Sequence, residues 1–257
     1  MSRLLRPLWF FVWSAALAPL LSGQVTESPE TVKPGKFLLE MDGLSLTFDR
    51  DRSAGERFEA IGIASALIMT GITDDLDVQV GLDCFRRETY VSSGTRDSRS
   101  GLGDLTLRAK YTVWRARDGG AAAAVIPYVK APTSNGGLGN DAVEGGLIVP
   151  WSTQTAGGFV PGAMLVCDIV RNDADDGYES QWALTAYVER EVLQGITAYA
   201  ELIFQTDPGT ASRAAGEAGA GARSRLGEHI ELDYQILRGL NGRASDWTHV
   251  LRVNWEW

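Results

Sequence analysis

Cysteine and histidine are scarce in this 257-residue chain, which has two of each. Cys84 and Cys167 lie far apart and show no metal-binding spacing, so we expect free thiols and exclude a disulfide framework. Neither His229 nor His249 lies in a G-x-S-x-G or comparable nucleophile context. His229 shares the phase of Glu231, so a His–carboxylate pair is one interpretation, although an ordinary lumen or rim histidine is the simpler one. Hydrolysis needs a histidine base beside a nucleophile or activated water, so we expect no catalysis.

An excess of positive charge is also missing. The formal net charge is −9 and the pI is about 4.8, whereas nucleic-acid binding needs a basic surface. Beyond the N-terminus the chain has no apolar run of 18 residues, which excludes a helical membrane protein. We therefore expect no nucleic-acid partner and no membrane-spanning helix.

Two loops could hold a cofactor or a metal ion, but both lack the required pattern. The acidic loop with Asn172, Asp173, Asp175 and Asp176 lacks the spacing and terminal Glu of a calcium loop, so a solvated turn is the better interpretation. The glycine-rich stretch Ser134–Asn140 follows a strand but opens no helix, so it is not a phosphate-binding loop. We expect neither a metal ion nor a cofactor.

The N-terminus predicts secretion. Arg3 and Arg6 precede an apolar core at Leu8–Leu21, and Ser22 and Gly23 offer small residues for cleavage. This core is too short for a membrane anchor, so we predict a signal peptide at 1–23. A polar, proline-bearing stretch at 24–35 then predicts a short periplasmic tail, and residues 36–257 form one domain.

Apolar and polar residues alternate with a period of two in the stretch Gly101–Trp151. In its first strand, Leu107 and Tyr111 share the apolar phase, whereas Arg108 and Lys110 share the polar phase. This pattern is typical of a strand with one apolar face and one solvated face. The same phase recurs in the next two strands, with no helix between them. Charges in the polar phase call for a closed sheet that is solvated on one side only.

About twelve such strands of roughly ten residues cover the domain. We expect them at Phe37–Phe48, Phe58–Thr70, Leu76–Phe85, 105–113, 121–132, 143–151, Phe159–Val170, Tyr178–Glu189, Ile196–Gln205, Arg213–Ala222, Ile230–Ile236 and Leu251–Trp257. Longer, more polar loops, including a long one predicted at Arg86–Ser100, alternate with shorter turns, including one predicted at Arg223–Glu228. Transmembrane barrels show this asymmetry, with long external loops and short periplasmic turns.

The predicted fold class is therefore all-β, an antiparallel transmembrane β-barrel of about 12 strands. The apolar phase would face lipid and the charged phase would face a wet lumen, because mid-strand charges in a packed core are costly. Aromatic residues of the apolar phase suit the two membrane interfaces. They are Tyr111, Trp151, Trp182, Tyr234, Trp247, Trp255 and Trp257.

The C-terminus and several internal segments resemble a known family. The Trp-Glu-Trp ending resembles the C-terminal signature that the barrel assembly machinery recognises, although most such barrels end in Phe rather than in a Trp like Trp257. The chain resembles the outer-membrane barrel family described as "putative MetA-pathway of phenol degradation", often called a transporter. The segments that carry this resemblance are Gly103–Tyr111, Pro127–Thr133, Val143–Pro150 and Asp168–Tyr178. It implies a Gram-negative cell outer membrane, outer-membrane lipid and the assembly machinery as partners, and transport of a small-molecule solute.

Candidate lumen-lining residues follow from the polar phase. They are Arg108, Lys110, Tyr128, Lys130, Glu144, Tyr187, Glu189, Glu201, Glu231 and Asp233. Either they select solutes, or they pair across neighbouring strands and fill a narrow barrel. Our leading hypothesis is a channel for passive uptake of small molecules, with aromatic or hydrophobic compounds as candidates. A non-conducting structural or adhesive outer-membrane barrel is the alternative, and a periplasmic ligand-binding barrel is a third.

Overall fold

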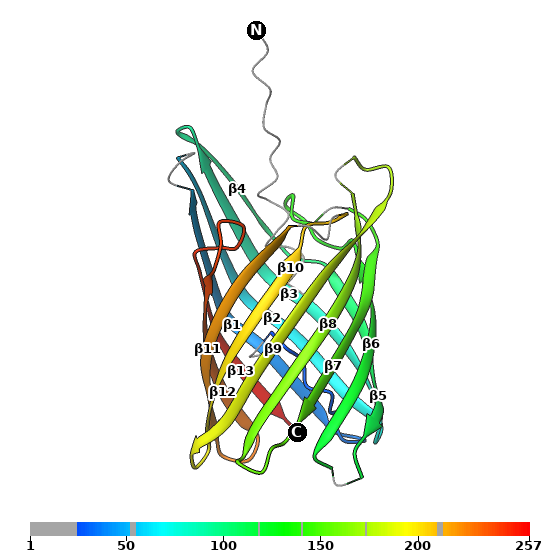
Figure 1. Ribbon diagram of the computed structural model, residues 1–257. Coiled ribbons are helices and arrows are strands. Elements are labelled where there is room, and N and C mark those ends of the chain that lie inside the picture. Colours follow the sequence, from blue (N-terminus) through cyan, green and yellow to red (C-terminus); the bar gives the residue numbers. More distant parts are fainter. Residues whose placement is uncertain (1–24, 52–54, 118, 140, 173, 210–212) are drawn as a thin grey trace.

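A computed structural model describes residues 25–51, 55–117, 119–139, 141–172, 174–209 and 213–257. The predicted signal peptide lies outside these residues. The described residues form no helix, and twelve of their thirteen strands build a tall barrel (Figure 1). The barrel strands are β1 (Phe37–Asp51), β2 (Glu56–Thr73), β3 (Leu76–Ser92), β5 (Leu105–Arg115), β6 (Ala121–Ala131), β7 (Glu144–Thr153), β8 (Phe159–Arg171), β9 (Tyr178–Leu193), β10 (Ile196–Thr206), β11 (Ala214–Leu226), β12 (Ile230–Gly239) and β13 (Trp247–Glu256).

Twelve of these strands close into one antiparallel sheet. Each pairs with its neighbour in the chain, and β1 pairs with β13 to close the barrel, with Leu38 opposite Glu256 and Phe48 opposite Trp247. Among the described residues, closure leaves these twelve strands without a free edge strand, as a sheet surrounded by hydrocarbon requires. The predicted twelve-strand antiparallel barrel is therefore confirmed.

Two predicted connections are wrong. Instead of a loop at Arg86–Ser100, β3 continues to Ser92 and turns back into β4 (Thr95–Gly101), which pairs only with the upper part of β3. The polar composition hid this hairpin, because a strand pair that rises above the membrane needs no apolar face. Likewise β11 continues through Arg223 to Leu226, and a short turn follows. The hairpin stands at the end of the barrel that carries the longer connections (Figure 1).

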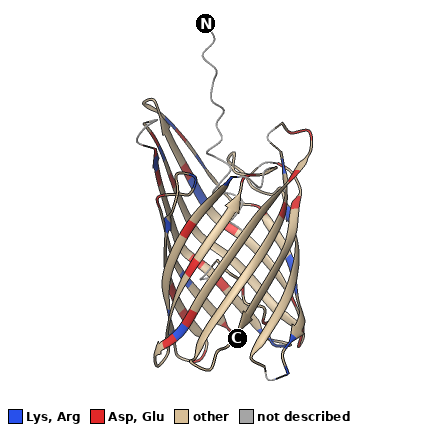
Figure 2. Ribbon diagram, in the orientation of Figure 1, with Lys and Arg blue, Asp and Glu red and all other residues tan. Residues whose placement is uncertain are grey.

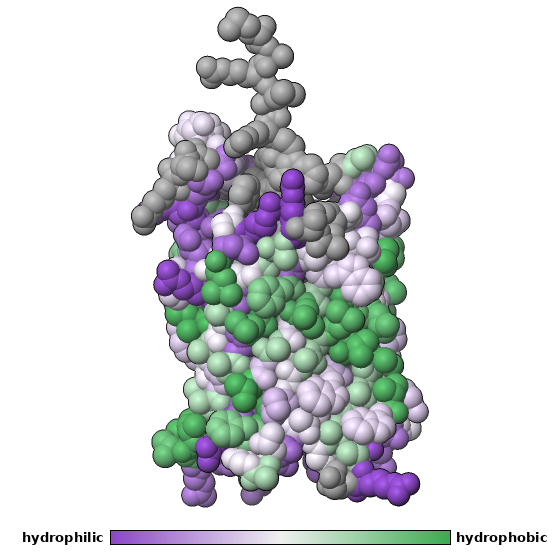
Figure 3. All heavy atoms as spheres, in the orientation of Figure 1, coloured by the Kyte–Doolittle hydropathy of each residue, from purple (hydrophilic) through white to green (hydrophobic). Residues whose placement is uncertain are grey.

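The outer surface is apolar across the middle of the barrel and polar at the end with the long loops (Figure 3). Leu107, Leu184 and Leu202 are about half exposed, although they lie in the middle of strands. All seven aromatic residues predicted for the interfaces are also exposed on this surface. A search of the described residues finds no helix long and apolar enough to cross a membrane. The apolar phase therefore faces outward, as predicted.

The alternation shifts by one residue along a row that crosses β1, β2 and β3. On β1, Asp42 is buried whereas Leu44 is exposed; on β2, Ile63 is exposed whereas Ser65 is buried. Between them Ala64 has a φ of 56°, in the left-handed region that non-glycine residues rarely adopt. The break explains why the β2 sequence is apolar in both phases: each half turns a different set of residues outward.

Candidate functional site in the barrel lumen

The stretch Val25–Lys33, which we call the lumen segment, lies inside the barrel. Below it, Pro34 bridges Gly71 at the end of β2, where the short turns lie, and Thr26 and Glu27 are fully buried higher up. A side chain at Gly71 would collide with the backbone of Val32 and Lys33. Sequence patterns predict a tail for residues 24–35, but the described part of this stretch makes most of its contacts with inward-facing side chains of the barrel.

Glu27 forms an ion triad with two cations of β5. Its carboxylate contacts the Arg108 guanidinium, and Lys110 Nζ lies 3.1 Å from Glu27 Oε2. The three side chains are 1–5% exposed. Buried charges are stable only when they are paired and hydrogen-bonded, so the triad depends on all three members.

Thr26 contacts the wall across the lumen from β5. The backbone N–H groups of Val25 and Thr26 donate to the two Glu201 carboxylate oxygens at 3.0 and 2.7 Å. The Thr26 hydroxyl lies 2.5 Å from both Glu201 Oε1 and the Thr185 hydroxyl, and Gln235 donates to Glu201 from β12 at 2.8 Å. Glu201 thus accepts four hydrogen bonds, from Val25, Thr26 and Gln235.

The lower half of the segment is held by single hydrogen bonds to the wall and by one exposed ion pair. Thr112 donates to the Pro29 carbonyl at 2.8 Å, and the Val32 N–H donates to Asp77 at 3.0 Å. Arg115 lies 3.2 Å from Glu30, but both side chains are substantially exposed. The segment is therefore held most tightly at Thr26 and Glu27.

Further ionisable groups pair across the wall itself. Lys130 lies 2.5 Å from Glu144, between β6 and β7. Tyr128 donates to Asp168, and Tyr199 donates to Asp233 at 2.9 Å. Two more ion pairs join Arg223 to Glu189 and Arg252 to Asp42.

Each of the ten predicted lumen residues is buried or half-buried on an inward-facing position. Charged residues occur along the strands as well as at both ends (Figure 2). Arg108 and Lys110 lie on β5, whereas the other wall carries mostly acidic residues: Glu189, Glu201, Glu231 and Asp233 on β9–β12. In the strand order, β5 and β10 are separated by four strands on one side and six on the other, so the two groups face each other.

Five further charged residues line the lumen that were not among the predicted ones: Glu27, Asp42, Asp168, Arg223 and Arg252. Glu27 lies in a stretch without periodicity, so no pattern marks it. The polar phase of β1, β8, β11 and β13 does mark the other four residues, because each has an inward-facing residue two positions away on the same strand.

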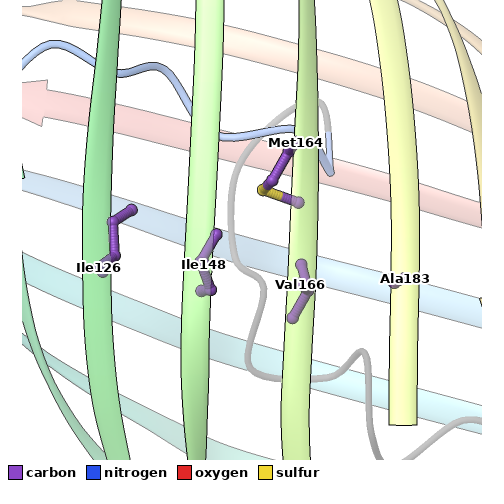
Figure 4. Packing of buried hydrophobic residues seen from close by; sticks show 5 residues of the cluster. All are labelled: Ile126, Ile148, Met164, Val166 and Ala183. Carbon is purple, nitrogen blue, oxygen red and sulfur yellow. The ribbon is translucent and has the colours of Figure 1, made fainter. Parts of the chain in front are cut away.

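One part of the lumen wall is apolar. Ile126, Ile148, Val166 and Ala183 face each other in register on four neighbouring strands, β6 to β9, and Met164 extends the row on β8 (Figure 4). We call these five residues the apolar row; each is at most 2% exposed. Val25 and Tyr128 pack against it, and the Glu27 N–H lies 3.4 Å from Met164 Sδ.

The residues considered for other chemistry lie elsewhere. The Tyr234 hydroxyl bonds to His249 at 2.8 Å on the outer surface, and Asn172 closes the acidic loop by hydrogen bonds to Asp176. Cys84 and Cys167 are both free. Within the described part of the chain, no group of three or more His, Cys, Asp or Glu residues could hold a metal ion.

A closed barrel that turns apolar side chains outward and charges inward is stable where hydrocarbon surrounds it, and this chain is accordingly an outer-membrane β-barrel protein. Its family is equally clear. The family described as "Putative MetA-pathway of phenol degradation" matches residues 22–257, and the chain belongs to it. A search of curated proteins finds no match.

Solved structures share the fold at low sequence identity. The COG4313 outer membrane channel from Pseudomonas putida F1 is 15% identical, with a TM-score of 0.69, over 90% of this chain and 98% of that one. The β domain of the Bordetella autotransporter BrkA is 16% identical, with a TM-score of 0.55, over 88% and 100%. The KdgM porin, solved with oligogalacturonate, is 6% identical, with a TM-score of 0.50, over 82% and 97%. These likenesses concern the fold.

Proposed function

We propose that this protein is a passive outer-membrane channel for small molecules, and that the lumen segment closes it. The observation that carries the proposal is the lumen itself: ionisable side chains line it on opposite walls, and a short segment held by side-chain contacts fills its middle. A barrel built only for mechanical support could fill its lumen with apolar side chains from the strands, at lower electrostatic cost.

In the closed state, solute passage is blocked at the level of Glu27. Arg108 and Lys110 are nearly inaccessible to water there, because the segment covers them. The segment joins the barrel through Lys36, at the end with short turns, so it can leave the lumen without breaking a strand. Solutes then diffuse through a polar lumen, and the ten predicted lumen residues contact them.

The fold neighbours that are channels and porins support transport rather than catalysis, and we propose that the protein is not an enzyme. We also propose that the C-terminal strand, ending in Trp255 and Trp257, engages the barrel assembly machinery. The rings of Trp255 and Trp257 lie against each other at a tilt of 39°, with ring centroids 4.9 Å apart. The buried state of the lumen favours one alternative, a non-conducting structural or adhesive barrel.

Planar-bilayer recording separates the two. The mature chain and a variant that lacks residues 25–33 are compared in potassium chloride, and liposome swelling is measured with phenolic and sugar solutes. We expect brief, rare openings from the mature chain and a steady, larger conductance from the deletion variant. If the deletion variant, folded by the criterion of heat-modifiable gel migration, conducts no current, the channel proposal fails and the structural barrel remains.

A further inference from the structure

The lumen segment brings a carboxylate and an apolar surface together at one place on the wall. Its Glu27 carboxylate contacts Arg108 and Lys110, whereas the backbone N–H of the same residue lies on Met164, at the apolar row. Val25, two residues away, packs against that row. A single short stretch therefore spans from the cation pair on β5 to the aliphatic side chains on β6–β9.

Departure of the segment uncovers both surfaces at once. The two cations lose their carboxylate, and the five aliphatic side chains of the apolar row lose Val25. Water hydrates the cations, but contact between water and the row is unfavourable, by about 25 cal/mol for each Å² exposed. The open lumen thus presents a cationic group beside an apolar one, within the reach of one small molecule.

We infer that the open lumen binds a small monoanion in which a carboxylate is attached to an apolar body, such as an aromatic ring, in place of Val25–Glu27. The carboxylate would bind Arg108 and Lys110, and the apolar body would cover Ile148 and its neighbours in the row. This inference rests on the proposed function, because the site forms only when the segment leaves.

The chemistry of the wall narrows the class of solute. A guanidinium beside an ammonium favours a carboxylate, because planar carboxylates accept paired charge-assisted hydrogen bonds. Glu201 and Asp233 on the facing wall repel additional negative charge, which favours a monoanion over a dianion. A sugar would bury hydroxyl groups against the apolar row, where no partner meets them.

The segment and the solute compete for the same place. The apparent dissociation constant of the solute equals its intrinsic value divided by the fraction of open molecules. Glu27→Gln weakens the segment and leaves both cations in place, so it should tighten solute binding. Lys110→Gln removes one cation of the solute site but also weakens the segment, so it is added to Glu27→Gln, where the segment is already weakened and the loss of the cation should weaken solute binding. Arg190→Gln removes the same charge from the outer surface, where Arg190 lies over Phe159, and serves as the matched control.

The experiment is calorimetric titration of the full mature chain in nanodiscs with benzoate, benzyl alcohol and acetate. We expect wild-type protein to bind benzoate at least tenfold more tightly than either other probe, because each lacks one of the two matching groups. Relative to wild type, the benzoate affinity should rise about 50-fold in Glu27→Gln, as the open fraction increases, and stay unchanged in Arg190→Gln. Relative to Glu27→Gln, it should fall about tenfold when Lys110→Gln is added. Tenfold corresponds to about 1.4 kcal/mol.

Equal affinities for the three probes, or no measurable benzoate binding by wild type and Glu27→Gln, would overturn the inference. The wild-type comparison requires no substitution, so a folding defect in one variant cannot rescue the inference. Conductance in potassium chloride is recorded on the same preparations. If the protein conducts but does not prefer benzoate, only the inference on the class of solute is refuted. If the deletion variant does not conduct, the proposed channel function itself is refuted.

Discussion

The closed state should depend on Glu27 far more than on its neighbour Glu30. Glu27→Gln keeps the size of the side chain but removes the charge that Arg108 and Lys110 face in a site only 1–5% exposed. Removing one partner of a buried ion pair costs about 3–5 kcal/mol. This cost falls on the closed state alone, since lumen water hydrates both cations once the segment has left.

A loss of about 3 kcal/mol changes the ratio of closed to open molecules roughly 100-fold. If about one wild-type channel in a hundred is open, more than half should be open in Glu27→Gln. Glu30→Gln removes the same charge three residues further on, where Arg115 is 32% exposed and Glu30 is 57% exposed. Exposed pairs contribute about 0–1 kcal/mol, so the open fraction should change less than about fivefold.

Single-channel recording at low voltage gives the open fraction of each variant directly. Equal increases for Glu27→Gln and Glu30→Gln would refute the argument, because burial would then not decide the strength of the contact. An open fraction in Glu27→Gln that matches wild type would refute it as well.

Three other predictions follow from the same structure. Leu184→Arg, on the lipid face in the middle of β9, should lower the free energy of unfolding by about 2–4 kcal/mol, whereas Val192→Arg near the turn should lower it by about 0–1 kcal/mol. Both values are measured by urea-dependent refolding into vesicles, and equal losses would contradict the predicted position of β9 in the membrane. Gly71→Ala should raise the open fraction in bilayer recordings without removing a charge, because the added Cβ collides with the backbone of Val32. Gly81→Ala is the control and should leave the open fraction unchanged, because its Cβ has no neighbour closer than 3.4 Å. The detergent-extracted mature chain should migrate faster on gels before boiling than after it; identical migration would argue against a closed barrel.

The barrel could be predicted from the sequence because its wall obeys one local rule. On β5, Leu107 and Tyr111 point outward while Arg108 and Lys110 point inward, and each choice depends only on the neighbouring residues. The rule fails at Ala64, where a left-handed backbone reverses the phase. It also gives no information on the β3–β4 hairpin, because both faces of that hairpin are wet.

The lumen segment could not be predicted in this way. Glu27 binds Arg108, which is 81 residues away, and Thr26 binds Glu201, which is 175 residues away, and neither lies on a strand next to the segment in sequence. A clue was nevertheless present. In the register of β5, Arg108 lies between Gln79 and Tyr128, neither of which is anionic, so the residues directly beside it on the wall do not supply its carboxylate partner.

Neighbouring strands satisfy the other inward charges to different degrees. Lys130 and Glu144 pair across β6 and β7, as expected for groups on adjacent strands. Glu201, in contrast, accepts hydrogen bonds from backbone N–H groups and a hydroxyl of the segment and from the Gln235 amide. The sequence therefore indicated which residues point inward, but the partner of each depended on contacts between distant parts of the chain.

The arrangement of charge on the two walls has a consequence for any molecule that crosses the lumen. Because Arg108 and Lys110 stand opposite Glu201 and Asp233, the electric field at this level runs from one side of the pore to the other, at right angles to the direction of travel. A zwitterion or a strongly dipolar molecule would lie crosswise there, with its negative end at β5. Passage would then depend on how charge is distributed within a molecule, and two solutes of equal width and equal net charge would cross at different rates.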